Sequence, residues 1–185
     1  QSRAINFSNA FVNNTTRADV TNADFKQFWV YGDYQNDALW VDVFNNVKVS
    51  GASVGSSATW TPEETAYWQV NKTYNFGAYA DGTSQLTTGI LYEPASKTLT
   101  FLDYSAGAND LIAATSSDVS WDGSVDPAKV QLSFKHMLSK VKFTFKTDAV
   151  ETYTMKVSGL KISQAIQTAT GTMVNNVVGT WSGDK

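Results

Sequence analysis

The chain contains a single histidine, the side chain most often used for acid–base chemistry and metal binding near neutral pH. His136 lies in VQLSFKHMLSKVKFTFK, residues 130–146, where apolar and polar residues alternate as in a half-buried strand. It shares its phase with Phe134 and Leu138, so all three are predicted to face the core. Because the chain has no second histidine and no cysteine, we interpret His136 as a core histidine bonded to backbone or to a hydroxyl. Phe134, His136 and Leu138 are thus expected to be structural residues.

The alternation changes phase after Leu138, because Val141, Phe143 and Phe145 are the apolar residues that follow it. A shift of one residue moves every later side chain to the opposite face of a strand. The sequence therefore predicts a bulge near Ser139, or passage of this strand from one sheet to another.

Other groups that could do chemistry are sparse. The carboxylates of PEE (62–64), NAD (22–24) and SGD (182–184) lack the paired, partly buried setting of a general acid and base. The motifs DGTSQ (81–85) and DGSVD (122–126) lack the spacing of a calcium loop, and turn formation explains them. No GxSxG, phosphate-binding glycine loop or HExxH occurs. We predict no catalytic residue, no metal site and no cofactor, and the chain is not expected to be an enzyme.

Composition excludes several classes of partner. The net charge of -3 provides no basic surface for phosphate backbones, so nucleic acid is not an expected partner. No apolar run approaches the roughly 20 residues of a membrane-spanning helix. Hydrophobic residues make up 42% and charged residues 17% of the chain, which is typical of a packed globular domain rather than a disordered one.

The elements that position these residues are predicted to be strands. Runs rich in β-branched and aromatic residues recur between clusters of Gly, Asn, Asp and Ser. The predicted strands are 5–12, 25–31, 39–44, 73–80, 98–103, 111–114, 130–146 and 154–166. Only TPEETAYW, residues 61–68, resembles a helix start, and a single turn is predicted there. This pattern predicts an all-β, two-sheet sandwich with Greek-key type connectivity, forming a single domain over residues 1–185.

The order of the motifs resembles one known family. The segments are FWVYG (28–32), YWQVNKTYNFGAYADG (67–82), KTLTFLDYSAGANDLIAATS (97–116), residues 130–146, LKISQAIQTATGT (160–172) and GTWS (179–182). They are similar, in this order, to the N-terminal domain of the fimbrillin family, the pilins of Bacteroidales-type bacteria. The resemblance implies a transthyretin-like sandwich and a structural subunit of a fimbria that supports adhesion. It also implies an exported protein at the cell surface and outer membrane, held by a lipid anchor outside this chain.

Family members lose their first strand to an arginine-specific protease. The stretch AINFSNAFVNNTTRADVT, residues 4–21, fits this pattern, with cleavage between Arg17 and Ala18. The apolar residues of the removable strand are Ile5, Phe7, Phe11 and Val12. Arg3 is a rival site, and Arg17 is preferred because cleavage there removes a whole strand. The emptied groove could then be filled by a strand of another fimbrial subunit, and head-to-tail filling builds a fibre.

The family usually continues into a second sandwich, so residues 1–185 are expected to be the N-terminal domain of a longer, two-domain protein. The alternative function is a glycan-binding or adhesin-type surface lipoprotein domain, with a host protein or glycan as partner. Exposure of several tryptophans on one face would favour that alternative. The tryptophans concerned are Trp29, Trp60, Trp68, Trp121 and Trp181. An enzyme ranks below both.

Overall fold

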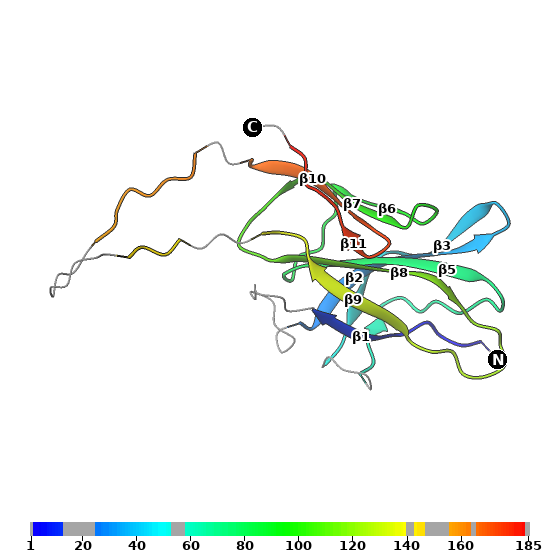
Figure 1. Cartoon of the computed structure of the whole chain (residues 1–185). Coiled ribbons are helices and arrows are strands. Elements are labelled where there is room, and N and C mark those ends of the chain that lie inside the picture. Colours follow the sequence, from blue (N-terminus) through cyan, green and yellow to red (C-terminus); the bar gives the residue numbers. More distant parts are fainter. Residues whose placement is uncertain are drawn as a thin grey trace.

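The computed structural model describes residues 2–12, 25–52, 58–139, 143–146, 156–163 and 166–183 (Figure 1). The described part has no helix and forms two β-sheets, which confirms the predicted all-β, two-sheet arrangement. The strands are β1 (Phe7–Val12), β2 (Gln27–Asn36), β3 (Leu39–Ser50), β4 (Thr61–Pro62), β5 (Thr73–Asp81), β6 (Ile90–Glu93), β7 (Thr98–Ser105), β8 (Leu111–Ser120), β9 (Val130–His136), β10 (Thr168–Val174) and β11 (Val177–Val178).

The larger sheet has the strand order β1-β9-β8-β5-β2-β3-β4, and the smaller one β11-β10-β7-β6. The described pairs are antiparallel except β1 with β9, which run parallel. The chain leaves β5 to form β6 and β7 in the smaller sheet and returns as β8 beside β5. Strands β6 and β7 are thus inserted along the chain between two neighbouring strands of the larger sheet.

The seven-stranded sheet is buried on both faces. Along β2, Phe28 and Val30 enter a large aromatic cluster on one face, whereas Trp29 enters a smaller cluster on the other. The smaller cluster also contains Leu99 and Phe101 of β7, so it fills the space between the two sheets. The larger cluster lies on the opposite face and includes Ile5 and Phe7 of the first strand, the name used below for residues 3–12, of which β1 is a part.

The prediction of one long strand over 130–146 is wrong beyond His136. The described residues 137–139 and 143–146 are not strand, and neither are residues 156–163, where a strand over 154–166 was predicted. Residues 143–146 (olive) and 156–163 (orange) lead away from the sandwich in Figure 1. Phe143 and Phe145 are about half exposed. Alternation alone does not make a strand, because a strand needs a neighbour to accept its backbone hydrogen bonds.

The predicted helical turn at 61–68 is also wrong. Thr61 and Pro62 form β4 and pair with β3, and the residues after them bend without forming a helix. Three short strands were not predicted: β6, β10 and β11. In β10, TATGTMV, only Gly171 and Met173 are buried, so the apolar alternation is too weak to show in the sequence.

Candidate functional site

The first strand lies against β9 on one side. Phe7 is opposite Val130, and Val12 is opposite Phe134, in parallel register. The Val130 N–H donates a 2.8 Å hydrogen bond to the carbonyl of Asn6, which extends the pairing just before β1 begins. Figure 1 shows β1 (dark blue) beside β9 (yellow) along the lower edge of the molecule. This contact alone would make β1 an ordinary edge strand.

A second partner, which we call the facing segment (residues 60–68), lies on the other side of the first strand. Phe7 and Trp60 exchange two backbone hydrogen bonds of 3.0 and 2.8 Å. Two further bonds of 2.9 Å continue the pairing, from the Ile5 N–H to Ala66 and from the Trp68 N–H to Arg3. Because the facing segment includes β4, the last strand of the large sheet, the first strand joins the two ends of that sheet. The sheet is closed on itself along this seam.

The apolar side chains of the first strand fill the space that the sheet encloses. Phe7 is 0% exposed and Ile5 is 1% exposed. The Phe7 ring lies edge-on to Phe28 and Phe76, with centroids 5.7 and 5.8 Å away, and tilted to Phe44 at 5.9 Å. Full burial of one such side chain contributes about 1.5–3 kcal/mol. The first strand is therefore part of the main core, not a covering layer.

The contacts of the first strand define the site chemically. If the strand left, β9 and the facing segment would lose these backbone hydrogen-bond partners, and the aromatic floor beneath Phe7 would meet water. Paired main-chain groups combined with pockets for alternate side chains are the elements of strand addition. The candidate functional site is thus the groove that the first strand occupies.

The sequence-predicted processing site falls outside the described residues. Arg17 and Ala18 lie in the range 13–24, about which the structure says nothing. The backbones of Phe11 and Val12 belong to β1, and their side chains lie outside the description. The cleavage at Arg17 therefore stays a prediction.

His136 ends β9 beside a carboxylate. Its Nδ1 is 2.5 Å from Oδ2 of Asp110, and the two side chains are 11% and 12% exposed. The partner is therefore an acidic group, whereas the sequence suggested a backbone group or a hydroxyl. Phe134 is fully buried and Leu138 half-buried, while Met137 between them is 3% exposed. Met137 belongs to the cluster between the sheets, the face opposite to that of Phe134, so it continues the alternation. Leu138 packs against the same cluster as Met137, so the phase changes at Leu138, just after β9 ends at His136.

Acidic residues gather on the large sheet near its β2 and β3 strands. Asp33 and Asp42 are cross-strand neighbours. Burial, and then the charges of Asp42 and Glu93, raise the pKa of Asp33 to about 6. Burial and the charge of Glu64 also raise the pKa of Asp42. Since like charges opposite one another weaken an antiparallel pair, this group makes stability depend on pH.

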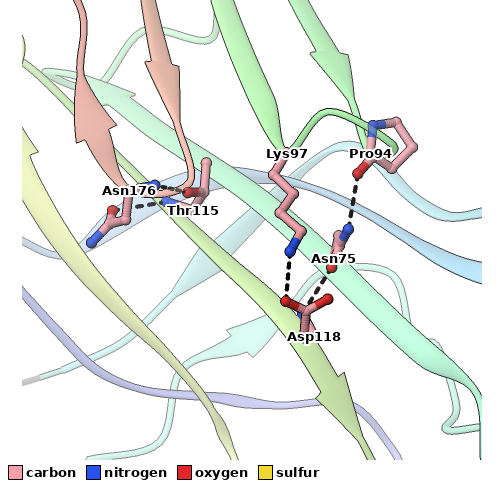
Figure 2. A network of polar contacts seen from close by, with 6 residues as sticks. All are labelled: Asn75, Pro94, Lys97, Thr115, Asp118 and Asn176. Atoms are coloured by element: carbon pink, nitrogen blue, oxygen red, sulfur yellow. Dashed lines mark hydrogen bonds and ion pairs between the residues drawn. The ribbon is translucent and has the colours of Figure 1, made fainter.

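A buried asparagine supports an irregularity in β8 (Figure 2). In the pairing of β5 with β8, the register shifts where Asn75 faces the region of Asp118, a residue with a φ of 58°. The side-chain oxygen Oδ1 of Asn75 accepts a 2.8 Å hydrogen bond from the Asp118 N–H. The side-chain Nδ2 of Asn75 donates to the carbonyl of Pro94, also at 2.8 Å. Lys97 forms an ion pair with the Asp118 carboxylate. These bonds tie the β6–β7 turn to the large sheet.

A second polar contact joins the β10–β11 turn to β8 (Figure 2). The Asn176 side chain accepts the Thr115 N–H at 3.1 Å, and the Asn176 N–H donates to the Thr115 hydroxyl. Asn175 and Asn176 both have positive φ, as a two-residue hairpin turn requires. Sequence reasoning missed this anchor, although the pair of asparagines between MV and VV is its signal.

The tryptophans do not form an exposed face. Trp29, Trp60 and Trp68 are buried, and Trp40, Trp121 and Trp181 are half-buried. Several exposed tryptophans on one face were the feature that would favour a glycan-binding domain.

Within the described ranges, no cluster of three or more His, Asp or Glu could hold a metal ion. The same part of the chain has no helix long and apolar enough to span a membrane.

Comparison with known proteins agrees with the arrangement of strands. The model of the fimbrillin-like family matches residues 16–185. A crystal structure of a proposed cell adhesion protein from Bacteroides uniformis has a similar fold, with a TM-score of 0.54 and 19% sequence identity. That similarity covers 100% of this chain, and the chain spans 66% of the length of the Bacteroides protein. No curated protein matches in sequence. The family match covers most of the chain, and the protein belongs to the fimbrillin-like family.

Proposed function

We propose that the chain is a structural subunit of a bacterial cell-surface fimbria and supports adhesion. In this proposal, an arginine-specific protease cuts after Arg17, the first strand leaves, and a strand of another subunit takes its place. The observation that carries the proposal is the placement of the first strand. It joins two ends of one sheet, buries Ile5 and Phe7 in the main core, and is hydrogen-bonded on both sides.

The physical consequence of cleavage is an incomplete core. The chain after Arg17 would keep Phe28, Phe44 and Phe76 but lack the side chain that packs among them. Exposing this floor and the two backbone edges is unfavourable, so the groove binds a replacement strand with a large driving force. Filling by a different subunit is a head-to-tail contact that does not close on itself, and it therefore extends into a fibre.

The location follows from the same proposal. A fimbrial subunit acts outside the cell, so the protein is exported to the surface and the outer membrane. It contacts the membrane through a lipid anchor outside this chain, and its partners are other fimbrial subunits. A host protein or glycan is the partner that an adhesive fimbria would meet.

Limited digestion tests the proposal. The folded chain is treated briefly with an arginine-specific protease, and the products are identified by intact mass and N-terminal sequencing. The expected product begins at Ala18, stays folded, and holds the first strand only noncovalently. The variant Arg17→Lys is the matched control, because it keeps the charge and removes the cleavage site. Resistance of the Arg17 bond, or collapse to small fragments, would mean that the first strand is permanent core.

A further inference from the structure

Building on the proposed function, we propose that the groove selects its incoming strand by orientation and sequence. The strand must run parallel to β9 and carry a basic, a branched aliphatic and an aromatic residue at positions i, i+2 and i+4. In the chain itself, Arg3, Ile5 and Phe7 occupy these positions. The partner is therefore a β-strand of stated chemistry, not any apolar segment.

The aromatic position is set by the shape of the core. Phe7 meets Phe28 and Phe76 edge-on and Phe44 at a tilt, and no part of its side chain is exposed. Aromatic rings favour these edge-on geometries. A smaller side chain would leave a cavity among three rings held by different strands, β2, β3 and β5. Such a cavity closes poorly because close-packed interiors relax only partially.

The aliphatic position lies two residues earlier on the same face. Ile5 is 1% exposed and belongs to the same core cluster as Phe7. Its N–H is bonded to Ala66 of the facing segment, so the backbone at this position is fixed. An aromatic ring is larger than this buried isoleucine, and adding atoms to a closely packed site is destabilising. The two positions therefore favour side chains of different size and shape, and their order along the groove sets the register.

The basic position lies at the open end of the groove. The Arg3 guanidinium is 2.7 Å from the carboxylate of Asp126, beside a hollow of about 390 Å³ that Trp121 and Val125 also line. The Trp121 indole N–H donates to the Val125 carbonyl at 2.6 Å, which holds this loop in shape. Arg3 and Asp126 are 41% and 79% exposed, so the ion pair contributes less to affinity than the two buried positions do. Its effect is to mark one end of the groove.

The orientation follows from where that end lies. Asp126 comes shortly before β9, so it marks the beginning of this strand. A strand that starts with its basic residue at Asp126 must therefore run in the same direction as β9, as the first strand does. A reversed strand would place its basic residue at the far end, near Phe134, where the wall is apolar.

Exchange of synthetic peptides tests the rule. The chain is cut after Arg17, with its own strand still bound, and labelled peptides are added while fluorescence anisotropy is followed. The native peptide comprises residues 2–12. The matched control exchanges the residues at positions 5 and 7 (Ile5→Phe with Phe7→Ile), which keeps composition, charge and alternation. A third peptide carries Arg3→Glu and is tested on the original chain and on Asp126→Lys.

We expect the native peptide to exchange, the position-swapped peptide to bind at least roughly tenfold more weakly, and Arg3→Glu to bind roughly threefold to tenfold more weakly. Asp126→Lys should restore binding of the Arg3→Glu peptide. Equal binding of the native and position-swapped peptides would overturn the sequence rule and leave strand exchange intact. No exchange of any peptide would overturn both the rule and the proposed function.

Discussion

Truncation of Phe7 measures how far the core depends on the first strand. Phe7→Ala removes a fully buried ring that packs against three other phenylalanines. Phenylalanine-to-alanine changes in cores cost about 3–5 kcal/mol. The expected loss lies in the upper part of that range. The three contacting rings belong to three different strands, so they cannot all move inward to fill the space that the smaller side chain leaves. In a domain of this size, about 4 kcal/mol corresponds to a fall in Tm of roughly 8–16 °C.

Urea unfolding followed by tryptophan fluorescence is the suitable assay, since Trp60 and Trp68 lie in the facing segment. The matched control is Phe145→Ala, which removes the same atoms from a side chain that is 54% exposed. We expect the control to change the free energy of unfolding by less than about 1 kcal/mol. A loss below about 1 kcal/mol for Phe7→Ala, or equal losses for both variants, would refute the view that the first strand completes the core.

Three other changes have defined outcomes. Gly51→Ala should destabilise the fold by about 1–3 kcal/mol, because an added Cβ would lie 2.3 Å from the Trp60 ring. The first strand should also leave the cut chain faster, and mass spectrometry measures its rate of release. Asn75→Ala should cost about 1–3 kcal/mol in thermal unfolding, since two main-chain groups lose their partner. Asp33→Asn should raise stability by about 1 kcal/mol at pH 7.5 and leave it unchanged near pH 3.5. The pKa of Asp33 in the folded state is raised to about 6. The stability that protonated Asp33 provides is therefore fully present below its unfolded pKa and is lost as pH rises through about 6. Urea midpoints of wild type and variant at both pH values test it, and a constant difference would contradict the reasoning.

The sequence predicts the parts of the fold whose apolar pattern is dense. Ile5 and Phe7 alternate in a short apolar run, and the part of the run from Phe7 to Val12 forms β1. The strand from Val130 is equally readable up to His136. Beyond it, Phe143 and Phe145 continue the pattern without forming strand, because a periodic sequence specifies which face is apolar and does not supply a pairing partner.

The facing segment pairs with the first strand although its sequence has no strand-like pattern. Residues 60–68 carry one proline and two glutamates that suggest a helix start, yet Trp60 and Trp68 are buried and pair with the first strand. Their pairing is with residues more than 50 positions earlier, and local propensity contains no information about such a contact. The β10–β11 hairpin was missed for a different reason, since its turn signal, Asn175–Asn176, was present and not used.

The most direct test of the account is the structure of an assembled fibre by electron cryomicroscopy. We expect the space between β9 and the facing segment to hold a strand from a neighbouring subunit, parallel to β9, with an aromatic side chain over Phe28, Phe44 and Phe76. We also expect residues 2–17 of the same subunit to be absent from the fibre. A fibre in which each subunit keeps its own first strand in this groove would contradict the account.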